Sequence, residues 1–299
     1  MNAVDPARLM RVATVASMTV AVCLIGAKTA AWLLTESVSM LSSLVDSSLD
    51  FVASLVTFLA VRQALTPADA DHRFGHGKAE ALAGLTQAGF IAASGGGLLL
   101  NVGERLLHPQ HVQQEMIGVA VSAAAIVLTL GLVGFQSYVV RRSGSIAIGA
   151  DKAHYMTDIV SNLAVGAALF LSGRFDLPLI DAVVAGAVAI YLLFGAWHVG
   201  LASLDVLMDR ELPDSDRLRI VDIAKRHAQV QDIHDLRTRS SGLTKFIQLH
   251  IELDPTLPLT RAHEIGDQVE AEIQAAFPDA EIILHVDPYG VEERRVGFA

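Results

Sequence analysis

Six long apolar segments, separated by short polar stretches, occupy the first two thirds of the chain. They cover about residues 12–34, 40–60, 79–107, 116–140, 146–171 and 179–204. About 20 apolar residues are enough for a helix to cross a hydrocarbon core of roughly 30 Å. Formal charges are rare here: residues 12–45 contain only Lys28 and Glu36, and residues 116–140 contain none. The pattern predicts a transmembrane domain of six helices over residues 1–208.

A different pattern begins near residue 209. Helical spacing and strand-like alternation follow each other over residues 214–227 (helix), 233–239 and 245–253 (strands), 260–277 (helix) and 281–286 (strand). The order α-β-β-α-β predicts a small α+β domain over residues 209–290, with its helices on one face of a three-stranded sheet. Residues 291–299 are expected to form a charged tail.

The distribution of Lys and Arg predicts how the helices are oriented. With the N-terminus inside, the inner flanks carry Arg8, Arg11, Arg62, Arg73, Lys78, Arg141, Arg142 and Arg210, whereas the outer flanks carry only Arg105 and Arg174. Cytoplasmic flanks are the ones enriched in these residues. Since six is an even number of spans, both termini and the C-terminal domain are expected in the cytoplasm.

Composition narrows the class of protein further. Hydrophobic residues make up 52% and charged residues 18% of the chain, and the mean hydropathy is +0.46, which is typical of a membrane protein. The single cysteine, Cys23, excludes a disulfide scaffold and a cysteine-rich metal site. A net charge of −10 argues against nucleic acid and for cations. No P-loop, dinucleotide fingerprint or hydrolase motif occurs, so we expect no nucleotide, no organic cofactor and no enzymatic activity.

Two pairs of potential metal ligands lie inside apolar segments. Asp46 and Asp50 are four residues apart, as are His154 and Asp158, so each pair lies on one face of its helix. Buried charges in a membrane span usually serve function. Two helices giving two ligands each could surround a divalent ion. Without a metal, protons must compensate the carboxylates; alternatively, the pairs lie near the interface and only aid packing.

Two further clusters combine His with Asp. The polar loop after the second segment contains Asp69, His72 and His76 within eight residues, which is metal-ligand spacing, although a solvated loop with incidental histidines fits as well. The C-terminal domain holds a third candidate metal site or, alternatively, scattered surface histidines. Its residues are His234, His250, His263, His285 and Asp287.

Three other charged residues of the apolar segments are expected to lie at the membrane surfaces. Lys28 is near the outer end of the first segment and is expected to extend its amine toward the outer surface. Asp151 and Lys152 are expected to face the inner interface.

Five motifs identify the chain as similar to a known family. They are SLVDSSLD (43–50), FGHGKAE (74–80), HYMTD (154–158), HDLRTR (234–239) and HVDP (285–288). Over about residues 10–290 the chain resembles the cation diffusion facilitators, most closely those of the bacterial zinc/ferrous-iron efflux type. The expected fold is therefore a membrane all-α six-helix bundle followed by a small cytoplasmic, metallochaperone-like α+β domain.

The resemblance implies roles for the candidate residues. Asp46, Asp50, His154 and Asp158 would form the transport site midway across the membrane, and Asp69, His72 and His76 a loop site at the inner surface. The five C-terminal residues would bind two metal ions, with Asp287 bridging them. Lys78 and Asp209 would interlock the protomers of a homodimer that alternates between inward-open and outward-open states.

The expected function is a proton-coupled antiporter that exports divalent transition metal across a bacterial inner membrane. One imidazole among carboxylates suits Zn²⁺ and Fe²⁺ and tolerates Cd²⁺. Partners are then metal ions, protons, the lipid bilayer and a second copy of the chain, and Zn²⁺ or Fe²⁺ also acts as a regulatory ion. The alternative is a membrane metal sensor or assembly scaffold on the same fold.

Overall fold

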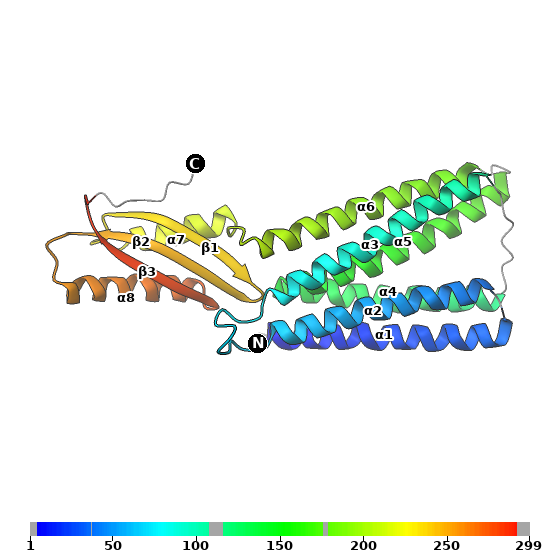
Figure 1. The fold of residues 1–299 in the computed structure, drawn as a ribbon, viewed down its shortest axis with the longest axis horizontal. Coiled ribbons are helices and arrows are strands. Elements are labelled where there is room, and N and C mark those ends of the chain that lie inside the picture. The colour runs from blue at the N-terminus through cyan, green and yellow to red at the C-terminus, as the bar shows by residue number, and fades with distance from the viewer. Residues whose placement is uncertain (1–4, 37, 108–115, 176–178, 292–299) are drawn as a thin grey trace. The chain divides into compact units, whose positions relative to one another are not determined.

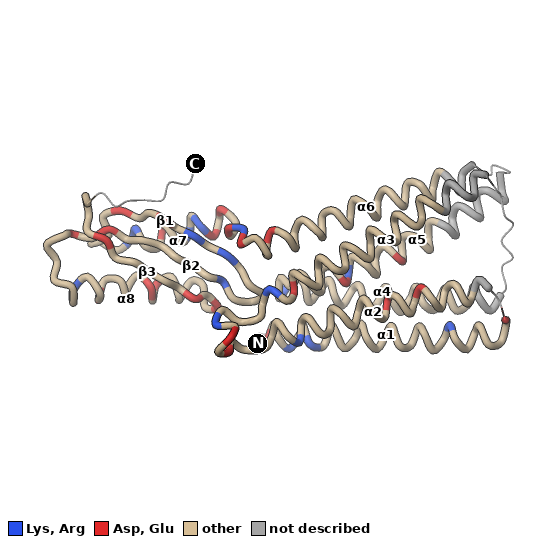
Figure 2. The backbone as a smooth tube through the Cα atoms, viewed as in Figure 1, with Lys and Arg blue, Asp and Glu red and all other residues tan. Residues whose placement is uncertain are grey.

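The computed structural model describes residues 5–36, 38–107, 116–175 and 179–291 and forms two compact units, Met1–Leu207 and Met208–Ala299. Most of the predicted charged tail, residues 292–299, lies outside the described residues. Figure 1 shows long helices in the first unit and a sheet with two helices in the second. Asp, Glu, Lys and Arg are sparse along the long helices and frequent in the second unit (Figure 2).

The first unit contains six helices. They are α1 (Pro6–Thr35), α2 (Val38–Ala64), α3 (Ala79–Leu107), α4 (Met116–Ser143), α5 (Ile146–Phe175) and α6 (Leu179–Leu207). Among the described residues, all of these except α5 are long and apolar enough to cross a membrane. Several helices extend a few residues beyond the apolar runs, because polar residues continue the helix, as Arg141 and Arg142 do in the last turn of α4.

Local sequence accounts for where these helices begin and end. Pro6 occupies the first turn of α1, and the Asp5 carboxylate accepts a hydrogen bond of 3.0 Å from the Ala7 amide, so the helix starts before its apolar run. Gly144, at φ +66°, ends α4 in the left-handed conformation that favours glycine. The turn into α5 is therefore short, and α5 packs directly against α4.

Helix packing places α5 among the other helices. It contacts α2, α3, α4 and α6, while α3 and α6 share the most extensive interface and α1 packs on α2 and α4. Gly95 permits the close approach of α3 and α6, because a Cβ there would lie 3.2 Å from Leu192 Cβ and 3.3 Å from the Ala189 carbonyl oxygen. Polar residues of α5 consequently face other helices.

The second unit follows the predicted order of elements. It consists of α7 (Asp214–Lys225), β1 (Asp232–Ser241), β2 (Thr244–Leu253), α8 (Leu259–Ala276) and β3 (Ala280–Pro288). The sheet order is β1-β2-β3, with β1 and β2 antiparallel and β2 and β3 parallel. Ile247, Leu249, Ile251 and Leu253 of β2 form a core with apolar residues of α7 and α8. Because strand side chains alternate, Gln248, His250 and Glu252 point to the opposite face.

Candidate metal centres

The first cluster joins α2 and α5 inside the first unit. His154 Nε2 lies 3.1 Å from Asp50 Oδ1 and 3.8 Å from Asp158 Oδ2. One ligand atom of each residue lies within 4.8 Å of the others, and the His154 residue is only 4% exposed. The carboxylates and the imidazole thus converge on one point, as in a site that holds a divalent ion with three protein ligands.

Asp46, the fourth predicted ligand, is outside this close group. It lies one helical turn before Asp50 on α2 and is exposed in the isolated chain. It is still near enough to Asp50 to interact with it electrostatically. The structure therefore brings together three of the four predicted ligands, and the role of Asp46 stays a prediction.

The placement of Lys28 differs from the expectation. Its ammonium does not extend to the outer surface but donates hydrogen bonds to Ser47 Oγ at 2.5 Å and to the Ser43 carbonyl oxygen at 3.1 Å, both on α2. Lys28 lines a cavity of about 60 Å³ together with Asp50 and Asp158. The expectation was wrong because α2 supplies two acceptors within hydrogen-bonding distance of the ammonium.

The second cluster lies in the loop between α2 and α3. Asp69 Oδ1 is 3.3 Å from His72 Nδ1, and Asp69 Oδ2 is 3.4 Å from His76 Nε2. The backbone amides of His72 and Asp71 donate to the Asp69 carboxylate at 2.7 and 3.0 Å. The His72 amide above all lowers the pKa of Asp69, so this exposed carboxylate stays ionised below its usual range. The loop presents an anionic group and two imidazoles to a cation.

The third cluster lies on the uncovered face of the sheet. Strand register places His234 opposite His250 and His250 opposite His285. Asp287 Oδ2 is 2.7 Å from His250 Nδ1 and 3.3 Å from His234 Nε2, while Asp287 Oδ1 is 3.0 Å from His285 Nε2. Asp287 is 3% exposed. Both of its oxygens thus face imidazole nitrogens, which is the arrangement that a bridging carboxylate requires.

Two residues of this region differ from the predicted set. His263 lies apart on α8, where its highly exposed side chain is 3.6 Å from Asp267. Glu252, which the sequence did not single out, places Oε1 2.9 Å from His234 Nδ1. Glu252 could have been found from the alternation of β2, because it lies two residues from His250 and points to the same face.

The model of the cation efflux transmembrane domain matches residues 14–208, more than half of the chain. The chain belongs to the cation efflux family. The model of the cytoplasmic domain of cation efflux proteins matches residues 212–289. These matches confirm the resemblance to the cation diffusion facilitators, and the predicted fold class is confirmed with them.

Whole-length relatives support the same family. A protein named cation-efflux pump FieF from Cronobacter sakazakii is 44% identical over 290 residues, covering 97% of this chain and 96% of the relative. One of the same name from Shewanella oneidensis is 46% identical over 283 residues, covering 95% of both. A solved metal-bound C-terminal domain of the CzcD transporter from Thermotoga maritima is 29% identical, covers 26% of this chain and 93% of that chain, and has a TM-score of 0.26. The family match and the two relatives named FieF show that the chain is a cation efflux transporter of the membrane.

This cation efflux protein also contains a buried carboxylate that the sequence analysis misplaced. Asp151 does not face the inner interface but is 1% exposed. It accepts hydrogen bonds from Ser17 Oγ at 2.8 Å (α1), Ser54 Oγ at 3.4 Å (α2), Gln87 Nε2 at 3.3 Å (α3) and Gln136 Nε2 at 2.7 Å (α4). Asp151 therefore connects α5 to four other helices. Its spacing of three and seven residues from His154 and Asp158 was the signal for a shared helix face.

The two residues that are predicted to interlock protomers of this cation efflux protein lie in different units. Lys78 belongs to the first, where its ammonium donates to the Leu207 carbonyl oxygen at 3.3 Å. Asp209 belongs to the second, where its carboxylate accepts from Arg239 at 3.3 Å. These contacts leave the pairing of Lys78 with Asp209 a prediction.

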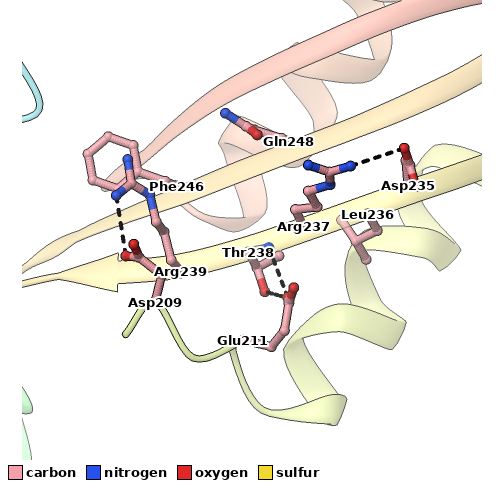
Figure 3. A pocket seen from close by; sticks show the side chains of 9 residues that line it. All are labelled: Asp209, Glu211, Asp235, Leu236, Arg237, Thr238, Arg239, Phe246 and Gln248. Carbon is pink, nitrogen blue, oxygen red and sulfur yellow. Dashed lines mark hydrogen bonds and ion pairs between the residues drawn. The ribbon is translucent and has the colours of Figure 1, made fainter. Parts of the chain in front are cut away.

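A larger cavity, of about 380 Å³, lies in the second unit of this efflux protein (Figure 3). Its charged side chains are already engaged: Arg239 lies 3.3 Å from Asp209 and Arg237 lies 3.4 Å from Asp235. Glu211 accepts a hydrogen bond of 2.9 Å from the Thr238 amide. None of the predicted metal ligands lines this cavity, so the volume of a cavity does not by itself identify the metal sites.

Proposed function

We propose that this transporter is a proton-coupled antiporter that exports divalent transition metal from the cytoplasm. The observation that carries the proposal is the convergence of Asp50, His154 and Asp158 between α2 and α5 of a cation efflux protein. Carboxylates with one imidazole form a ligand set of intermediate softness. Zn²⁺ and Fe²⁺ are the favoured cargo, and Cd²⁺ is tolerated.

Proton coupling follows from the chemistry of this ligand set. A metal binds only the deprotonated forms of His and Asp, so metal and protons compete for the same atoms. Partly buried carboxylates that lie close together also need a cation whenever the metal has left. Protons from the outside then displace the metal and are carried inward, which couples export to the proton gradient without nucleotide.

Zinc loading is expected to release protons. Zn²⁺ is added to purified protein in weak buffer at neutral pH, and the released protons are counted for the wild type and for Asp50→Ala. The variant retains the loop cluster and the C-terminal cluster, so the difference between the two counts reports the transport site. We expect a difference of about one to two protons per site. In vesicles, an imposed pH gradient should accelerate Zn²⁺ flux opposite to proton flow. Flux that ignores the gradient, together with metal binding that releases no protons from this site, would identify a uniporter instead.

We further propose that the protein is a homodimer in a bacterial inner membrane with both termini in the cytoplasm. The match to the cytoplasmic domain of cation efflux proteins and the excess of Lys and Arg on the inner flanks both support this orientation. The bacterial relatives support the location. The interlock of Lys78 with Asp209 belongs to the same proposal.

The C-terminal cluster is proposed to bind regulatory Zn²⁺ or Fe²⁺. If it does, a fragment of residues 209–299 should gain about 2.7 kcal/mol of stability at a free Zn²⁺ concentration of roughly 100 times Kd. For a domain of this size the melting temperature should then rise by roughly 10 °C or more. Calorimetry with and without Zn²⁺ measures the shift.

The matched control for this fragment is a pair of carboxylate substitutions. Asp287→Asn should abolish most of the zinc-induced shift, because Asp287 contacts three histidines. Asp279→Asn, at an exposed position outside the cluster, should leave it intact. An equal shift in both variants would mean that zinc binds elsewhere in the fragment.

A further inference from the structure

Lys28 brings a fixed positive charge to the proposed transport site. Its ammonium is held on α2 by Ser47, which lies between Asp46 and Asp50 in the sequence, and by the carbonyl oxygen of Ser43. It lines the same small cavity as Asp50 and Asp158 and interacts electrostatically with Asp46, Asp50 and Asp158. Lys28 is not itself a metal ligand, because an ammonium has no lone pair to offer.

The charge of the site depends on this residue. Three ionised carboxylates, Asp46, Asp50 and Asp158, carry three negative charges, and the Lys28 ammonium cancels one of them. Two negative charges remain, which is the number that one divalent ion neutralises. Without Lys28 the same carboxylates would match a trivalent ion and would hold a divalent ion more tightly.

Repulsion between the Lys28 ammonium and the bound metal also lowers the affinity of the site for metal. Even with a water-like effective dielectric constant of about 80, one fixed charge roughly 6 Å away changes the affinity for a divalent ion by about tenfold, and a lower dielectric constant enlarges the effect. The effect grows with the charge of the bound ion. A site that holds its cargo less tightly also releases it faster.

We propose that Lys28 is a specificity-determining residue that sets the charge of the transport site, favouring divalent over trivalent ions and keeping metal affinity low enough for turnover. The inference rests on the proposed transport site. It assigns to Lys28 neither metal ligation nor proton transfer. A substitution that removes the charge of Lys28 is therefore expected to change both KM and kcat and to change the preference between divalent and trivalent ions.

The test is Zn²⁺ flux in vesicles for Lys28→Met, Lys28→Arg and the neighbouring control Thr29→Val. In Lys28→Met, KM should fall about tenfold and kcat should fall by a similar or larger factor. The inhibition constant of La³⁺ against Zn²⁺ flux should fall by a larger factor than the KM for Zn²⁺. Lys28→Arg and Thr29→Val should stay near the wild type, because the first keeps the charge and the second leaves the cavity lining unchanged.

A double variant keeps the test decisive if Lys28→Met does not fold. Lys28→Met combined with Asp46→Asn restores two negative charges, so its ratio of La³⁺ inhibition to Zn²⁺ KM should return toward that of the wild type. An unchanged ratio in Lys28→Met overturns the proposal. A ratio in the double variant that differs clearly from that of the wild type overturns it as well, and this outcome needs no measurement on Lys28→Met. Flux that survives Asp50→Ala would instead overturn the transport site itself, so the two failures are distinguishable.

Discussion

Replacing Asp50 or Asp158 by alanine is expected to lower metal flux by at least about 100-fold while leaving the protein folded. Each substitution removes one carboxylate that faces His154, at 3.1 Å for Asp50 and 3.8 Å for Asp158. The remaining two ligands cannot surround a divalent ion at this point. Zinc flux into vesicles, normalised to the amount of inserted protein, measures the loss.

Controls separate loss of a ligand from loss of the fold. The oligomeric state of Asp50→Ala and Asp158→Ala, measured by size-exclusion chromatography in detergent, should equal that of the wild type. Glu36→Gln, which changes an exposed carboxylate at the end of α1, should transport normally. Flux at the wild-type level in both alanine variants would show that the cluster is not the transport site.

Replacing Asp151 by alanine is expected to destabilise the first unit by about 3–5 kcal/mol. The substitution removes the buried acceptor that Ser17, Gln87 and Gln136 share. The three donors then keep only their bonds within or between two helices, to the carbonyl oxygens of Ala13 and Ala53, to Thr57 Oγ1 and to Ser17 Oγ. Transport should fall as a consequence, because His154 lies one helical turn from Asp151 on the same helix. Thermal unfolding of the purified protein in detergent measures the stability.

Conservative and neighbouring variants define what this carboxylate does. Asp151→Asn keeps the volume and one acceptor oxygen, so it should cost less than alanine, about 1–3 kcal/mol. Lys152→Ala, at the next position, should change stability by no more than about 0.5 kcal/mol. If Asp151→Ala unfolded at the temperature of the wild type, the hydrogen bonds around Asp151 would not be what holds the five helices together.

The sequence by itself determined most of the architecture and most of the ligand set. Apolar runs long enough to cross a membrane predicted the six helices, and alternation predicted the three strands. The spacing of four residues between His154 and Asp158 was sufficient to place both on one face of α5, because helical periodicity is a local property of the backbone. Strand periodicity likewise placed His250 and Glu252 on one face of β2.

Only the tertiary structure decided which faces meet. Periodicity does not tell how far each helix is rotated about its own axis toward its neighbours, and that rotation buries Asp151 among four helices and turns Lys28 toward Ser47. It also leaves Asp46 outside the close ligand group, and the packing of α8 keeps His263 away from the cluster on the sheet. These placements depend on contacts between residues far apart in the chain, where charge and hydrogen-bond partners come from other elements.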